Sequence, residues 1–194
     1  MSVVYVLHRP IHHLGNPGLS FYSLNKRPGV RPIGICEVVR RIIGKVIVHI
    51  LHRYIRRAAG PLQVCVGQPA GAEAAIHAIS TLYSDPETEA VLLVDATNAF
   101  NLLNRQAALL NMHVLCPSLA TCLTNIYRAS TQLFVGGKTL LSQEGTTQGD
   151  PLAMPMFAIA TIPLIERVST AKADQIWFAD DVAGGGKMLS LRHW

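Results

Sequence analysis

Ala90-Val-Leu-Leu-Val-Asp95 is a short apolar run that ends in an acid, and the fold is organised around it. A wholly apolar run of this length is typical of a buried β-strand. Towards the end of the chain, residues 175–183 read Gln-Ile-Trp-Phe-Ala-Asp-Asp-Val-Ala, which predicts strands over 175–179 and 182–183 on either side of Asp180 and Asp181. A turn is expected at residues 184–186, which are all glycine. Three acids therefore stand at the ends of apolar strands.

These three acids occupy positions where an acid is costly. A carboxylate beside apolar residues loses hydration, and adjacent carboxylates repel each other. A cation relieves both costs, and two Mg²⁺ ions held by a few carboxylates stabilise the attacking and leaving oxygens of a phosphoryl transfer. A solvated turn is the alternative for Asp180 and Asp181 taken alone. The surrounding segments decide between the two interpretations.

The rest of the chain mixes helices with extended pieces. Four prolines and four glycines break residues 1–34 into loops and short extended segments, and a hairpin is expected over 131–142 around Gly136-Gly137. Apolar periodicity predicts the following helices: 36–58, 71–83, 102–114, 117–129 and 151–170. The expected fold class is α+β.

Length and composition exclude several classes of protein. The chain has 194 residues, of which 49% are apolar and 15% charged, so it can build a core and is not intrinsically disordered. No apolar run approaches the roughly 20 residues that span a bilayer, and the N-terminus lacks the apolar core of a signal peptide. The four cysteines form no disulfide framework or zinc motif. We expect an intracellular protein, nuclear or cytoplasmic, without a membrane partner.

Charge divides the chain into a basic and an acidic part. Residues 1–57 carry ten Lys or Arg against one acid, and residues 58–194 carry seven against eleven. This division indicates a surface for polyanions beside carboxylates that could hold metal. Arg40, Arg41 and Lys45 lie on the basic side of the helix predicted over 36–58. They suggest contact with a template backbone, or only a solvated helix face.

Five segments in this order resemble one known family. Phe178-Ala-Asp-Asp181, Asp95-Ala-Thr-Asn-Ala-Phe100 and Gly145-Thr-Thr-Gln-Gly-Asp-Pro-Leu152 resemble motifs C, A and B of the reverse transcriptase palm. Upstream, Gly29-Val-Arg-Pro-Ile-Gly34 looks like the fingers motif of that family, and Gly67-Gln-Pro-Ala-Gly71 like the segment before motif A. The likeness is to retrotransposon polymerases, particularly those of the non-LTR type.

The resemblance implies a fold, an activity and partners. It implies a right-hand polymerase with a fingers-like part at 26–88 and a palm at 89–194, after an unassigned segment at 1–25. Its activity would be RNA-directed DNA synthesis, in which dNTPs are added to a primer 3′-hydroxyl on an RNA template. The cofactor would be two Mg²⁺ ions, with Mn²⁺ able to substitute.

The metal site implied by the resemblance has three acids. Asp95 and Asp180 match the metal-binding carboxylates of the family, the carbonyl of Ala96 matches a further ligand, and Asp181 matches the second acid of motif C. The elementary argument from desolvated carboxylates leads to the same residues.

Further residues match the nucleotide site of the family. Phe100 falls where an aromatic ring blocks a ribose 2′-hydroxyl, which predicts a preference for dNTPs, although a core phenylalanine is the alternative. Gln148 and Gly149 match the pair that packs on the incoming nucleotide. Arg31 and Lys26 match the residues that grip the triphosphate.

The likeness has limits at both ends of the sequence. Thirteen residues follow Asp181, so the sequence stops before the lysine of motif D, the primer grip and the thumb, and residues 1–22 do not resemble the family. We therefore expect a truncated reverse transcriptase domain, thumb absent, with its acids intact. Two alternatives stay open: a catalytically inactive remnant that binds nucleic acid through its basic half, and an RNA-dependent RNA polymerase.

Overall fold

A computed structural model describes residues 3–8, 38–135, 138–147 and 149–194 and has the expected α+β architecture. The helices are α1 (Val38–Ala59), α2 (Gly71–Ser84), α3 (Ala99–Leu102), α4 (Arg105–Leu115), α5 (Pro117–Tyr127), α6 (Ala153–Ala160), α7 (Ile162–Val168), a 3-10 turn η1 (Ser169–Ala171) and α8 (Met188–His193). The strands are β1 (Val3–His8), β2 (Ala90–Asp95), β3 (Thr131–Val135), β4 (Lys138–Ser142), β5 (Asp174–Phe178) and β6 (Asp181–Gly186).

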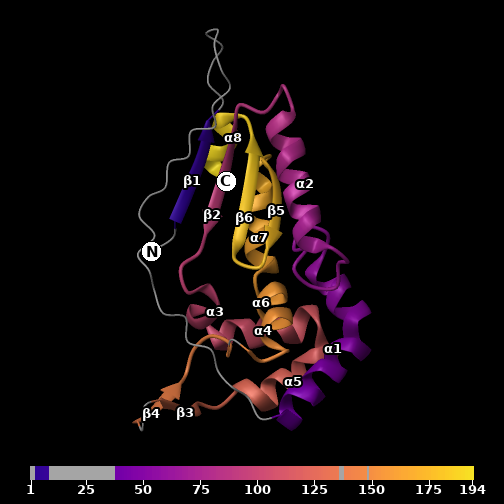
Figure 1. Ribbon diagram of the computed structural model, residues 1–194, viewed down its shortest axis with the longest axis vertical. Coiled ribbons are helices and arrows are strands. Elements are labelled where there is room, and N and C mark those ends of the chain that lie inside the picture. Colours follow the sequence, from indigo (N-terminus) through magenta and orange to yellow (C-terminus); the bar gives the residue numbers. More distant parts are fainter. Residues whose placement is uncertain (1–2, 9–37, 136–137, 148) are drawn as a thin grey trace.

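Four strands form one antiparallel sheet in the order β1-β2-β6-β5 (Figure 1). The predicted apolar strand is β2, and it pairs with β6 so that Val94 lies opposite Val182. Gln63 forms a parallel bridge to Trp177, which places the segment that follows α1 beside β5. β3 and β4 form a separate hairpin, as the sequence predicts, and Val135 lies opposite Lys138.

Helices cover the sheet on two sides. Trp177 and Val182 lie opposite each other on one face and pack against Ile162 and Ile165 of α7. The other face meets α2, where the Leu82 side chain lies against Gly185. Each face of the sheet therefore has its own helical cover.

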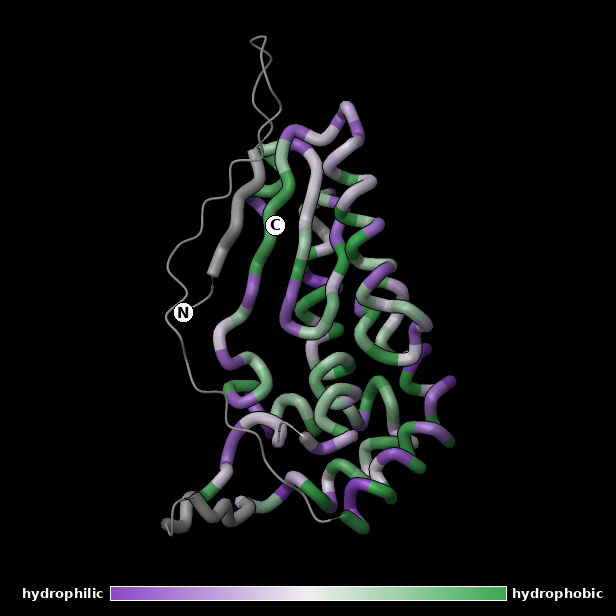
Figure 2. Tube along the Cα trace, viewed as in Figure 1, coloured by the Kyte–Doolittle hydropathy of each residue, from purple (hydrophilic) through white to green (hydrophobic). Residues whose placement is uncertain are grey.

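A second core is helical and lies beyond the end of the sheet where β2 finishes. It is formed by α1, α4, α5 and α6 and includes Met112, Leu119, Leu123, Met156 and Ile159, all fully buried. Figure 2 shows that α6 is apolar along its whole length, whereas polar and apolar residues alternate along α1. This alternation is the predicted amphipathic pattern, and the helix expected over 36–58 is confirmed as α1.

Two of the predicted helices are divided. The helix expected over 102–114 is preceded by the separate turn α3, and α4 begins only after Asn104, whose side chain accepts a hydrogen bond from the Ala107 N–H at 2.8 Å. Asparagine is a strong N-cap residue, so this start is explained by capping. The helix expected over 151–170 divides at Thr161, ahead of Pro163, into α6 and α7. A proline has no N–H to continue the helical ladder.

The prediction of a turn at residues 184–186 is wrong, because all three glycines lie in β6. A Cβ on Gly184 would lie 2.9 Å from the Trp194 ring, and one on Gly185 would lie 3.3 Å from Leu82. Here glycine marks close packing of helices on both faces of a strand, not a change of chain direction.

Several predictions fall outside the described residues. These are Lys26 and Arg31 with the fingers-like segment 29–34, the hairpin turn Gly136-Gly137, Gln148, and most of the unassigned segment 1–25. Among the helices that the structure does describe, none combines the length and the apolar character needed to cross a membrane.

Candidate functional site

Asp95, Asp180 and Asp181, here called the acid edge, lie at one end of the sheet. Asp95 is the last residue of β2 and lies directly opposite Asp181, the first residue of β6. Directly opposite residues of an antiparallel pair project from the same face and have neighbouring Cβ atoms. Folding thus brings together two acids that are far apart in the sequence.

Asp180 lies in the tight turn that joins β5 to β6. Phe178 pairs with Asp181, so Ala179 and Asp180 form a two-residue hairpin loop. Ala179 is 4% exposed and has a φ of +56°. An L-residue is about 1–2 kcal/mol less stable in this left-handed region, and strain of this kind is common at functional sites.

The turn is held by a residue that the sequence analysis missed. The Gln63 side-chain Nε2 donates to the Ala179 carbonyl at 3.2 Å, and the Ala179 N–H donates to Gln63 Oε1 at 2.9 Å. Burial raises the pKa of the nearby Cys65 thiol to about 11; the Ala179 N–H opposes this shift, and the charge of Asp180 adds to it. Residues 63–65 therefore lie against the turn that carries Asp180.

The loop before α6 is tied to the segment after Asp95. The Phe100 carbonyl accepts a hydrogen bond from the Thr146 N–H at 2.7 Å, and the Leu103 carbonyl accepts one from the Gly145 N–H at 2.8 Å. A Cβ on Gly145 would lie 2.3 Å from the Asn101 carbonyl oxygen, so only glycine fits there. The segments that resemble motifs A and B therefore meet through their backbones.

Phe100 lies on α3 and is partly buried. Its ring stacks on that of Phe157 in α6, with the centroids 4.3 Å apart and the planes 23° from parallel. One face of the Phe100 ring is therefore packed in the way expected of a core phenylalanine. The same contact fixes the orientation of the ring and so of its opposite face. Gly149 is exposed in the loop before α6 and has a φ of +102°, a conformation that favours glycine.

A buried network holds the same loop from behind. The Asp150 carboxylate accepts hydrogen bonds from Arg40 at 2.6 Å and from the Tyr127 hydroxyl at 2.9 Å. Arg40, for which the sequence predicts contact with a template backbone or a solvated face, is therefore part-buried and bound to a buried acid, whereas Arg41 and Lys45 are exposed. Burial, followed by the charge of Asp150, raises the pKa of Tyr127 well above its usual range.

Arg105 is a buried cation behind this loop. Its guanidinium donates to the carbonyls of Ser142, Glu144 and Gly145 at 2.8–2.9 Å and lies over the Tyr127 ring. Burial lowers its pKa. Neither Arg105 nor Asp150 had a local sequence signal, because their partners come from distant segments.

The donor chemistry of the acid edge suits a hard divalent cation, since carboxylate oxygens are the ligands that Mg²⁺ prefers. Over the described ranges, however, no three side chains of His, Cys, Asp or Glu gather closely enough to hold a metal ion. The fit to Mg²⁺ thus rests on the opposed pair Asp95 and Asp181, with Asp180 next to it in the turn.

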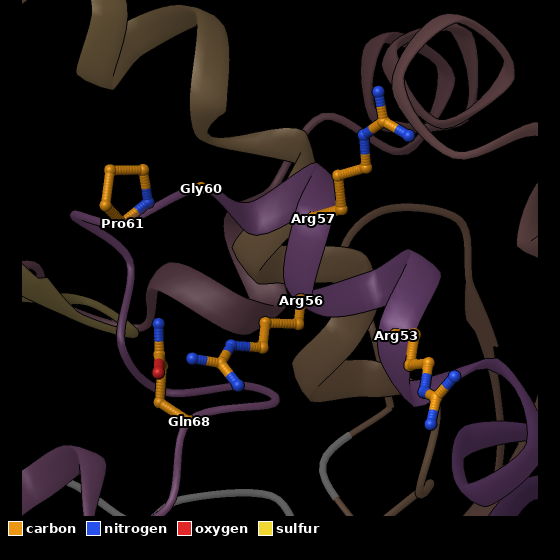
Figure 3. Close-up of a pocket in the computed structure, with 6 residues that line it drawn as sticks. All are labelled: Arg53, Arg56, Arg57, Gly60, Pro61 and Gln68. Atoms are coloured by element: carbon orange, nitrogen blue, oxygen red, sulfur yellow. The ribbon is translucent and has the colours of Figure 1, made fainter.

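A basic hollow of about 410 Å³ opens on α1 and the segment after it, apart from the acid edge. It is lined by Arg53, Arg56, Arg57, Gly60, Pro61 and Gln68. Figure 3 shows the Arg56 side chain extending towards Gln68, with Arg53 and Arg57 pointing in other directions. The three guanidiniums give this surface a strong positive charge.

No protein-family model matches the chain, and no curated protein matches it.

Proposed function

We propose that this chain is the catalytic part of an RNA-directed DNA polymerase of the reverse transcriptase kind. In this proposal the four-stranded sheet and its helices are the palm, and α1 belongs to the fingers. The observation that carries it is the register of β2 and β6, which sets Asp95 opposite Asp181 beside the turn that holds Asp180. Like charges this close repel each other, and a bound divalent cation would offset that repulsion.

The acid edge would hold the metal. Asp95, Asp180 and Asp181, with the Ala96 carbonyl, would bind Mg²⁺, or Mn²⁺ in its place, which would neutralise charge on the transferring phosphoryl group. The contribution of the protein is positioning, because the antiparallel ladder fixes two of the carboxylates relative to each other.

The nucleotide site would lie where α3 meets the loop before α6. Phe100, backed by Phe157, would leave no room for a ribose 2′-hydroxyl. Gly149 and Gln148 would pack on the incoming nucleotide, and Arg31 and Lys26 would bind its triphosphate. The backbone hydrogen bonds from Gly145 and Thr146 to the α3 region would hold Phe100 and the nucleotide-binding loop in one arrangement.

The test is primer extension by the full chain on poly(rA) and oligo(dT) with dTTP and Mg²⁺ or Mn²⁺. Asp95→Asn, Asp180→Ala and Asp181→Asn should each lower incorporation by about 1000-fold or more, in line with loss of a metal-stabilised transition state. Asp174→Asn, an exposed acid at the start of β5, is the matched control and should retain activity. Incorporation that survives all three changes at the acid edge would refute the assignment.

Sugar choice separates DNA synthesis from RNA synthesis. The wild type should use dTTP in strong preference to UTP, and Phe100→Val should raise the relative use of UTP by about 10-fold or more. Equal use of UTP and dTTP by the wild type would favour an RNA-dependent RNA polymerase instead.

The basic hollow supports a second candidate, nucleic-acid binding without catalysis. Arg53, Arg56 and Arg57 would contact phosphates, and affinity for single-stranded RNA would fall steeply with salt. Replacing all three arginines by Gln should weaken this binding and flatten its salt dependence, while Asp95→Asn should leave it intact. Polyanion binding by a wild-type chain that makes no DNA would favour this candidate.

A further inference from the structure

A buried glutamine lies beside the turn of the acid edge. Gln63, on the segment between α1 and α2, is fully buried at 0% exposure. The Leu62 carbonyl accepts a hydrogen bond from the Trp177 N–H at 2.9 Å, and the Val64 N–H donates to the Trp177 carbonyl at 2.8 Å. These two backbone bonds hold Gln63 alongside Trp177 of β5. Trp177 is two residues before Ala179 in the sequence.

The side-chain amide of Gln63 makes two hydrogen bonds to one residue, one as donor and one as acceptor. Its Nε2 donates to the Ala179 carbonyl and its Oε1 accepts from the Ala179 N–H, at 3.2 Å and 2.9 Å. The left-handed φ of Ala179 is unfavourable for an L-residue, and the two hydrogen bonds from Gln63 offset this cost. The side chain therefore stabilises the one backbone conformation of the turn that is intrinsically unfavourable.

Gln63 has little room to move. A Cβ on Gly71, the first residue of α2, would lie 2.0 Å from the Val64 carbonyl oxygen, so the segment is pressed between α2 and β5. The same Cβ would lie 3.7 Å from the ring of Phe178, the residue before the turn. A rigid support of this kind holds a functional group more closely than an exposed loop can.

We propose that Gln63 is a positioning residue: its amide fixes the Ala179 backbone and thereby sets Asp180 and Asp181 relative to Asp95. The proposal rests on the polymerase function proposed above. Ala179 directly precedes Asp180. A rotation of the Ala179 peptide would therefore change the orientation of Asp180 in the turn and of Asp181 at the start of β6. A displacement of about 1 Å in a catalytic group can lower a rate by about 100-fold.

Two substitutions of nearly equal size separate positioning from simple packing. Gln63→Met keeps the length of the side chain but removes both hydrogen bonds. Gln63→Glu places a carboxyl group there that can make both bonds only when it is protonated. Gln106→Met, on the exposed surface of α4, is the matched control.

The first measurement is steady-state primer extension on poly(rA) and oligo(dT) with Mg²⁺. Gln63→Met should lower kcat by about 100-fold and change the KM for dTTP by less than about 3-fold, the pattern of lost transition-state positioning. The activity of Gln63→Glu, relative to the wild type, should rise as the pH is lowered and the introduced carboxyl group is protonated. A kcat for Gln63→Met equal to that of Gln106→Met, or a flat relative pH profile for Gln63→Glu, would overturn the proposal.

The second measurement needs no activity. Amide hydrogen exchange, resolved by peptide mass spectrometry, should be faster at Ala179 by about 10-fold in Gln63→Met, because that N–H loses its acceptor. Exchange at Leu92 in the β2–β6 ladder should be unchanged, since a merely destabilised chain would open both sites. If the wild type makes no DNA, the proposed function fails, and an unchanged Ala179 exchange rate would separately overturn the role of Gln63.

Discussion

Asp150 and the aspartates of the acid edge have the same side chain in contrasting surroundings. The Asp150 side chain is 1% exposed, and its carboxylate accepts hydrogen bonds from Arg40, the Tyr127 hydroxyl and the Leu152 N–H. Asp181 is exposed and is paired with a second acid, Asp95, on the neighbouring strand β2. Hydrogen bonds to the buried Asp150 carboxylate stabilise the fold, whereas the like charges of two opposed acids repel each other.

This difference bears on where the proposed active site lies. The Asp150 network fastens the loop before α6, and its members come from α1, α5 and that loop. The acid edge instead contains an opposed pair of carboxylates, whose like charges repel, and an alanine at positive φ. Local conflicts of this kind are expected at functional sites, because activity accounts for what stability does not.

The largest expected effect is the loss of Asp150. Asp150→Ala leaves the Arg40 guanidinium and the Tyr127 hydroxyl without their shared acceptor, so the free energy of unfolding should fall by about 3 kcal/mol. Urea denaturation followed by circular dichroism measures it. Asp174→Ala, an exposed acid, should change stability by less than about 0.5 kcal/mol. Equal effects of the two substitutions would contradict the contrast between these regions.

Next in size is a pH effect at the acid edge. Burial raises the pKa of Cys65 from 9.0 to about 11, so its neutral thiol contributes stability that is complete below pH 9 and is lost as the pH rises through 11. Wild type should therefore lose about 2.5 kcal/mol relative to Cys65→Ala over this interval. Unfolding in urea at pH 8 to 11 measures the difference. A constant difference across these pH values would show that partial burial does not raise the pKa of the Cys65 thiol.

A smaller effect is expected from the phenol of the network. Tyr127→Phe keeps the ring beneath Arg105 but removes the hydroxyl that donates to Asp150 at 2.9 Å, and should cost about 1.5 kcal/mol. In the double variant with Asp150→Ala, the cost of Tyr127→Phe should shrink towards zero, because the acceptor is already absent. Full additivity of the two changes would argue against a direct bond.

What the sequence could predict was local. The apolar run of β2, the period of α1 and the proline at the start of α5 each identify an element through its own residues, and the structure confirms all three. The α+β class follows from such elements. The resemblance to the reverse transcriptase motifs likewise rests on short segments, and it stays a prediction.

What the sequence could not predict depends on contacts between distant segments. Arg40 and Asp150 are 110 residues apart, and Gln63 and Ala179 are 116 apart, so no spacing rule connects them. The glycines of β6 were assigned to a turn because their partners, Trp194 and Leu82, are visible only after folding. Asp95 and Asp181 were expected near each other, but their direct opposition is a matter of register, which turn geometry and pairing set.

The smallest expected effect has the opposite sign to the others and tests the acid edge most directly. Asp181→Asn removes the like charge opposite Asp95 without changing the size of the side chain, and should raise the free energy of unfolding by about 0.5 kcal/mol in EDTA. Because a bound divalent cation would stabilise the wild type but not the variant, the order of stability should reverse in excess Mg²⁺. Thermal unfolding with and without Mg²⁺ measures both. A variant less stable than wild type in EDTA would mean that Asp181 is a structural acid like Asp150, and the contrast between the two regions would fail.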